Sequence, residues 1–140
     1  ENIFLQDDEK VLAAVMAVLA YDRNDEMNLI IKNMPPRLYS SLRKISLTIR
    51  PLTQRLKAAG FETAKFCPSP GMSMYLWAGG KEWNEVIKET GIAEGDMATL
   101  VLRTADNLRQ IASLKDTHPD VAACAQKARE VILREPVLFL

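Results

Sequence analysis

Residues 94–114 read EGDMATLVLRTADNLRQIASL, and this stretch decides the fold of the 140-residue chain. Apolar side chains recur in it at the 3.6-residue spacing of an α-helix, with polar residues between them. About 21 helical residues measure roughly 32 Å, which is enough to cross a small domain. The stretch therefore predicts one long amphipathic helix. Its apolar stripe is Met97, Leu100, Val101, Thr104, Leu108 and Ile111, and its reverse side is Thr99, Arg103, Asp106 and Gln110.

The rest of the chain has the same helical periodicity and no confident strand. Acidic residues at Asp7 to Glu9 predict the start of a helix that is apolar nearly all round, so we expect it in the middle of the domain. The fold class predicted is all-α: a helical bundle of about five to seven helices around the long central helix, in one domain spanning residues 1–140. The expected helices cover about 7–21, 38–59, 72–78, 81–90, 94–114 and 119–133.

Composition and charge exclude several classes of protein. The chain is 48% apolar and 26% charged, as in an ordinary folded protein, and its 18 basic and 18 acidic residues cancel. Zero net charge argues against strong phosphate binding by the whole surface. Residues 27–61 nevertheless hold seven bases and no acid, and Arg43, Lys44 and Arg50 form a possible basic face there. The longest uncharged apolar run, residues 11–21, is too short to cross a membrane.

The sequence offers no metal-binding or catalytic signature. His118 is the single histidine, and Cys67 and Cys124 lie far apart in the chain, so we predict no metal site and two buried free thiols. Walker loops, GxGxxG after a strand, nucleophile elbows and HExxH are all missing. We therefore expect no catalytic residue and no cofactor in this chain.

One stretch is similar to a known family. Residues 77–110 read WAGGKEWNEVIKETGIAEGDMATLVLRTADNLRQ, and they resemble the W-A-x-G, E-I, T-x-x-x-E-G and R-(x)n-L-R-Q succession of the DSHCT domain. This is the C-terminal helical domain of superkiller-type DExH RNA helicases. Arg134 to Val137 also resemble the family's R-D-I-V. Because the chain starts at Glu1 without a Met or a leader, we expect it to be a C-terminal piece of a larger helicase.

The resemblance implies a function. The domain would support the RecA-like helicase core in cis, close a ring around single-stranded RNA and place residues 94–114 beneath it as a ratchet helix. Arg103, Arg109 and Gln110 keep the family's residue types and would face the RNA. The chain departs from the family at two places: Thr99 stands where the family usually has Arg, and Ala105 and Asp106 replace the family's acid pair. ATP and magnesium would bind in the parent's other domains, so the parent would be a cytoplasmic ATP-dependent RNA helicase and this domain non-catalytic.

Other interpretations remain open. Residues 81–90, Gly91 and the helix from Glu94 have the rhythm of a DNA-binding helix-turn-helix, although Glu94 and Asp96 would repel phosphates. A purely structural helical adaptor fits the zero net charge equally well. Arg103 is placed as well for pairing with Asp106 as for RNA contact. The apolar tail Val137 to Leu140 either folds back or docks on the core, and without the core we expect an exposed apolar patch and self-association.

Overall fold

The computed structural model describes residues 7–21, 25–32, 34–59 and 70–134. Among these residues it has seven α-helices, one 3-10 turn and no strand, which confirms the predicted all-α class. In chain order the elements are α1 (Asp8–Ala20), α2 (Met27–Ile31), η1 (Pro36–Leu38), α3 (Tyr39–Ala58), α4 (Pro70–Ala78), α5 (Trp83–Thr90), α6 (Glu94–Ala112) and α7 (Pro119–Leu133).

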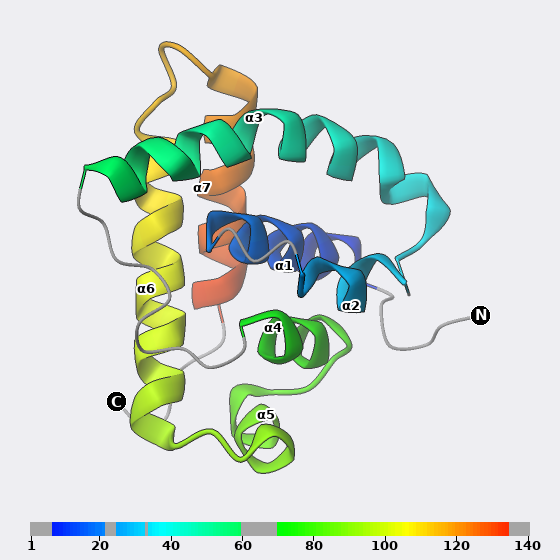
Figure 1. The fold of residues 1–140 in the computed structure, drawn as a ribbon. Coiled ribbons are helices and arrows are strands. Elements are labelled where there is room, and N and C mark those ends of the chain that lie inside the picture. Colours follow the sequence, from blue (N-terminus) through cyan, green and yellow to red (C-terminus); the bar gives the residue numbers. More distant parts are fainter. Residues whose placement is uncertain (1–6, 22–24, 33, 60–69, 135–140) are drawn as a thin grey trace.

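Helix α1 occupies the centre of the bundle. Val11 and every residue from Ala13 to Ala20 are buried, and the helix packs against α2, α3, α4, α6 and α7. Figure 1 shows α1 enclosed by these neighbours, with α6 along one flank. This confirms the expectation that the first helix lies in the middle of the domain, and α6 packs beside it. A helix that is apolar on all sides needs cover on all sides, whereas α6 is apolar on one side and keeps the other outside.

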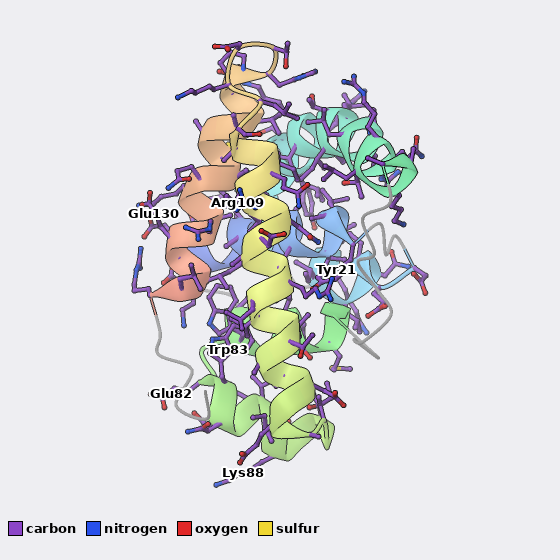
Figure 2. The ribbon with its side chains drawn as sticks, turned by 90° about the vertical axis from the view of Figure 1, so that its left-hand side faces the viewer. Tyr21, Glu82, Trp83, Lys88, Arg109 and Glu130 are labelled. Carbon is purple, nitrogen blue, oxygen red and sulfur yellow. The ribbon has the colours of Figure 1, made fainter. Side chains whose placement is uncertain are left out.

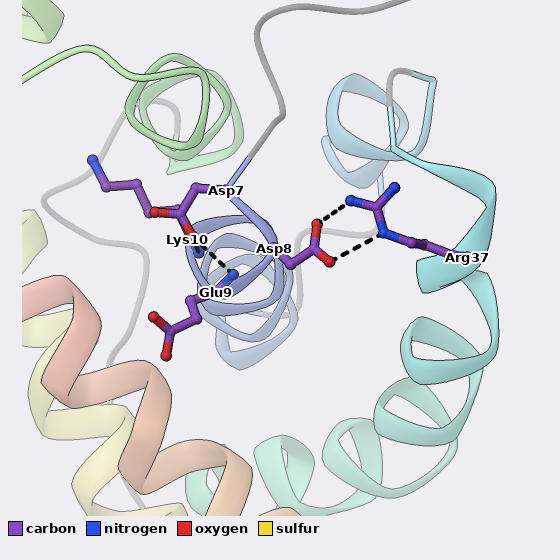
Figure 3. A network of polar contacts seen from close by, with 5 residues as sticks. All are labelled: Asp7, Asp8, Glu9, Lys10 and Arg37. Carbon is purple, nitrogen blue, oxygen red and sulfur yellow. Dashed lines mark hydrogen bonds and ion pairs between the residues drawn. The ribbon is translucent and has the colours of Figure 1, made fainter.

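The start of α1 is fixed by polar contacts (Figure 3). The Asp7 carboxylate accepts hydrogen bonds from the backbone N–H groups of Glu9 and Lys10 at 3.0 and 3.3 Å, which caps the helix as predicted. Arg37 donates to both carboxylate oxygens of Asp8, at 3.1 Å from Nε and 2.5 Å from Nη2. The hydrogen bonds from Arg37 to Asp8 raise the pKa of the Arg37 guanidinium. The pair ties the turn before α3 to the first turn of α1.

Helix α3 lies across one end of the bundle and packs against α1 (Figure 1). Its apolar residues recur at alternating steps of four and three, which predicts a heptad-like seam of Leu38, Leu42, Ile45, Ile49, Leu52, Leu56 and Ala59. Ile45, Ile49 and Leu52 of that seam are buried, whereas Ala59 is exposed because the helix ends there. The helix continues through Pro51 unbroken, and Figure 1 shows it curved, in keeping with the bend expected at a proline.

Two tryptophans join the shorter helices to the core. The rings of Trp77 in α4 and Trp83 in α5 are buried and stacked, with centroids 5.3 Å apart and planes 4° from parallel. Both rings are therefore packing residues of the core and are not exposed as platforms for nucleobases. Gly91 ends α5 in the left-handed region at φ +73°, as a C-terminal glycine does.

Three details were not predicted correctly or lie outside the described residues. Helix α2 was missed because it is a single turn within a polar stretch, although its Met27 and Ile30 are buried. Cys124 is exposed, because it lies on the outer side of α7 while Ala122 and Ala125 face inward. Cys67 and the apolar tail at residues 137–140 fall outside the described residues.

No helix among the described residues is both long and apolar enough to span a bilayer.

Candidate functional site

The predicted long helix exists and is continuous. Helix α6 runs from Glu94 to Ala112 without a break near Thr99 and ends two residues before the predicted Leu114. The residues that α6 buries against the other helices cannot contact a ligand. The burial pattern of α6 therefore decides which of its side chains a ligand can reach. All six residues of the predicted apolar stripe are buried: Met97, Leu100, Val101, Thr104, Leu108 and Ile111.

A buried hydrogen-bond network fixes the rotation of α6 against α1. The Tyr21 hydroxyl donates to the backbone carbonyl of Leu100 at 3.2 Å, and the Thr104 hydroxyl donates to the Tyr21 oxygen at 3.0 Å. Tyr21 is 1% exposed and Thr104 is 0% exposed, so both groups would be costly to leave unpaired. Thr104 belongs to the predicted stripe, but its partner Tyr21 was not predicted, because nothing local in the sequence links residues 83 positions apart.

The outer side of α6 carries the predicted site residues. Thr99, Arg103, Asp106 and Gln110 are partly exposed, and 60% of the Arg109 side chain is exposed. In Figure 2 α6 is the helix nearest the viewer, and Arg109 lies on it. The hydroxyl of Thr99 donates to the Gly95 carbonyl at 2.9 Å, which leaves its oxygen able to accept another bond. The structure thus brings all five residues together along one helix.

Asp106 organises its neighbours on this side. Its Oδ1 accepts from Arg109 Nη2 at 2.7 Å and Nε at 3.1 Å, and its Oδ2 accepts from Gln110 Nε2 at 3.1 Å. The hydrogen bonds from Arg109 hold the pKa of the Asp106 carboxyl below its usual value, with smaller help from Gln110 and the charge of Arg103, while partial burial opposes them. One carboxylate therefore orients Arg109 and Gln110 and offsets part of the local positive charge.

The possible basic face lies on a different element. Arg43, Lys44 and Arg50 are exposed on α3, which packs against α1, α7 and the 3-10 turn. The Nζ of Lys44 lies 3.7 Å from a carboxylate oxygen of Asp120 at the start of α7. The structure therefore does not unite these three residues with the site on α6, and they form a separate surface.

The described residues contain no group of three or more His, Cys, Asp or Glu side chains that could hold a metal ion. A hollow of about 230 Å³ lies between α4 and α5, lined by Tyr75, Leu76, Gly79, Lys81 and Glu89. Lys81 Nζ and Glu89 Oε1 are 3.0 Å apart at its edge, and the hydrogen bond from Lys81 to Glu89 raises the pKa of the lysine. None of the residues that line this hollow belongs to α6 or to the basic face.

Comparison with known proteins identifies the family. The family described as "DSHCT (NUC185) domain" matches residues 1–140. Over 61 residues, or 44% of the chain, the sequence is 39% identical to the Arabidopsis thaliana protein named "DExH-box ATP-dependent RNA helicase DExH15 chloroplastic", and this match spans 5% of that protein's length. No solved structure shows a significant match. The all-α bundle, the long one-sided helix and the match over residues 1–140 agree, and the chain belongs to the DSHCT (NUC185) domain family.

Proposed function

We propose that this domain is the C-terminal helical domain of a superkiller-type DExH RNA helicase and that the outer side of α6 contacts single-stranded RNA during translocation. The family match and the similarity to a protein named as an RNA helicase support the helicase context. In this proposal the domain carries no catalysis of its own. ATP and magnesium bind in the RecA-like domains of the parent, and those domains move the strand along α6.

The observation that carries the proposal is the continuous exposed edge of α6. Arg103, Asp106 and Gln110 follow one another at steps of three and four, so their side chains share one side of an unbroken helix. A guanidinium donates in a planar fork that fits phosphate oxygens, and an amide both donates and accepts. Since Asp106 already orients Arg109 and Gln110, these two donors are held in place before any strand arrives.

Two alternatives have specific observations behind them. A structural adaptor is favoured by the pairing of Asp106 with Arg109, which leaves the edge of α6 only weakly cationic. A helix-turn-helix regulator is favoured by the sequence of α5, Gly91 and α6, but both Glu94 and Asp96 in the first turn of α6 are exposed where DNA phosphates would lie. Contact with nucleic acid distinguishes the structural adaptor from the proposal, and a preference for single-stranded RNA over duplex DNA distinguishes the helix-turn-helix regulator from it.

The test is Arg103→Ala in the full-length parent protein. We expect RNA affinity and RNA-stimulated ATP hydrolysis to fall by about tenfold, which corresponds to ~1.4 kcal/mol. If Arg103 contacts a phosphate, the slope of log affinity against log salt should also decrease by about one. A residue that only supports packing would not change that slope.

Lys115→Ala is the matched control, because it removes a positive charge from an exposed position after α6. It should leave both RNA measurements unchanged, and far-UV circular dichroism should be the same for both variants. Unchanged affinity and salt slope for Arg103→Ala would remove Arg103 from the site. Loss in both variants alike would indicate a general charge effect instead.

We further propose a cytoplasmic location for the parent and self-association of the isolated domain through its apolar tail. The name of the similar Arabidopsis protein carries the word chloroplastic, so a plastid location is the competing outcome for the parent. Cell fractionation tests the compartment. Sedimentation equilibrium of the 140-residue chain tests the association, and a monomer at all concentrations would contradict it.

A further inference from the structure

The outer side of α3 has a regular arrangement that the function proposed for α6 does not use. Arg43, Leu47, Arg50 and Gln54 follow at steps of four, three and four, and all four are exposed. This spacing places them in one row on the side opposite the buried seam of Ile45, Ile49 and Leu52. The row, which we call the α3 outer row, is roughly 16 Å long at 1.5 Å per residue.

The charge of the α3 outer row is available to a partner. Helix α3 contains no acidic residue, and neither Arg43 nor Arg50 forms an ion pair with any residue in the described part of the chain. Two other basic residues of this region differ, since Arg37 is bound by Asp8 and Lys44 lies beside Asp120. The two arginines that flank Leu47 therefore keep their full charge.

The centre of the row is apolar. Leu47 is 71% exposed, more than any other large apolar side chain that the structure describes. Tyr39, two turns before it on the same side, is 46% exposed. Leu47 thus offers an apolar contact with one arginine about a turn before it and another about a turn after it in the same row. An amphipathic helix that lies along this row could cover the leucine and pair with both arginines.

The arrangement favours a protein helix over RNA and over a second copy of the chain. Phosphates and sugars gain nothing from an aliphatic side chain at the centre of the row, whereas a facing leucine or isoleucine would cover Leu47. Two copies meeting through this row would place Arg43 and Arg50 against like charges. Complementarity therefore requires acidic residues on the partner.

We propose that the α3 outer row is a docking surface for an acidic amphipathic helix, whose apolar residue packs on Leu47 and whose Glu or Asp side chains pair with Arg43 and Arg50. The electrostatic part sets orientation and association rate, and the apolar contact contributes to the lifetime of the complex. Because the row lies on α3, this interaction is independent of RNA contact by α6.

The test uses a synthetic helical peptide and the 140-residue chain. The peptide has about three heptads, with Leu at the seam and Glu at the flanking positions, and a scrambled peptide of equal composition is its control. Fluorescence anisotropy should show binding of the patterned peptide that weakens as salt rises. The double variant R43E/R50E should weaken this binding by at least about tenfold, and Leu47→Ala should weaken it by a smaller factor.

A charge exchange makes the test specific. A peptide with Lys in place of each Glu should bind R43E/R50E and not the unchanged chain, which a merely unfolded variant cannot do. The control variant K88E/K115E changes the same number of exposed charges on other elements and should bind the original peptide normally. Arg103→Ala should also bind it normally, so a failure of the RNA proposal for α6 leaves this result unaffected.

Three outcomes would overturn the proposal. The first is equal affinity for the patterned and the scrambled peptide. The second is no binding at about 100 µM peptide while circular dichroism shows a folded chain, since the affinity would then be weaker than that of most specific contacts. The third is binding of a single-stranded oligouridylate that R43E/R50E abolishes while the peptide does not bind, which would assign the row to RNA.

Discussion

The outer sides of α6 and α3 are both exposed faces of long amphipathic helices, yet their charges are arranged differently. On α6, Asp106 accepts hydrogen bonds from Arg109 and Gln110 of the same helix. On α3, Arg43 and Arg50 have no acidic partner among the described residues. The difference shows that a count of bases along the sequence does not tell how much positive charge a surface offers, because pairing within the fold decides it.

The largest expected loss of unfolding free energy comes from the buried side of α6, and the same substitution on its exposed side should cost far less. Leu108→Ala removes a side chain that is 0% exposed and should destabilise the domain by about 2–5 kcal/mol, through lost burial and the cavity left behind. Leu102→Ala on the same helix, where the side chain is 48% exposed, should stay within about 0.5 kcal/mol. Urea unfolding followed by circular dichroism measures both. Equal losses of unfolding free energy would contradict the assignment of Leu108 to the buried side of α6 and of Leu102 to its exposed side.

The hydrogen bonds between α1 and α6 should give the next largest effect. Tyr21→Phe removes the hydroxyl that Thr104 donates to and that bonds the Leu100 carbonyl, which leaves buried polar groups unpaired. We expect a loss of about 1–3 kcal/mol in the free energy of unfolding. The double variant Tyr21→Phe with Thr104→Val removes the unpaired hydroxyl as well and should recover part of the loss. A double variant less stable by the sum of both single effects would contradict this network.

Lowering the pH should reduce the stabilising contribution of Asp106 on α6, whereas the α3 outer row contains no carboxyl group that could be protonated. The pKa of Asp106 is lowered by Arg109, and that of Glu9 is lowered chiefly by Lys127, whose Nζ lies 2.9 Å from Glu9. A carboxyl whose pKa is lower in the folded than in the unfolded chain stabilises the fold at any pH above its unfolded pKa, which is 3.8 for Asp106 and 4.5 for Glu9. This stabilisation is lost as the pH falls through the lower pKa of the folded state. Unfolding free energies at about pH 7 and about pH 3 should differ less in Asp106→Asn than in the unchanged chain. An equal difference would mean that Asp106 does not contribute.

The smallest expected effect on the free energy of unfolding comes from removing one exposed arginine from the outer side of α6 or of α3. Arg109→Ala breaks the exposed pair with Asp106 and should cost about 0.2–0.5 kcal/mol, as pairs three residues apart on a helix surface do. Arg50→Ala on α3 breaks no ion pair with a described residue and should change the free energy of unfolding by no more than about 0.2 kcal/mol. Thermal unfolding of both variants at low and high salt measures the difference, which should vanish at high salt. A larger loss for Arg50→Ala would show that the arginine is not unpaired.

Much of the fold and the candidate site followed from periodicity. The stripe from Met97 to Ile111 predicted both the buried side of α6 and the exposed side with Arg103, because 3.6 residues per turn fix which side chains share a face. Periodicity failed at α2, which is too short for a pattern to appear. It succeeded for α1, whose apolar pattern nearly all round the helix predicted its place in the middle of the domain.

The sequence by itself determined six of the seven α-helices that the structure describes, the buried side of α6 and the family, since these depend on the spacing and type of neighbouring residues. Only the tertiary structure decided which groups pair across the fold. Tyr21 reaches Thr104 over 83 positions and Arg37 reaches Asp8 over 29, and no local pattern encodes such contacts. Helix packing sets these distances, and through them it decides which cations are neutralised and which, such as Arg43 and Arg50, have no acidic partner among the described residues.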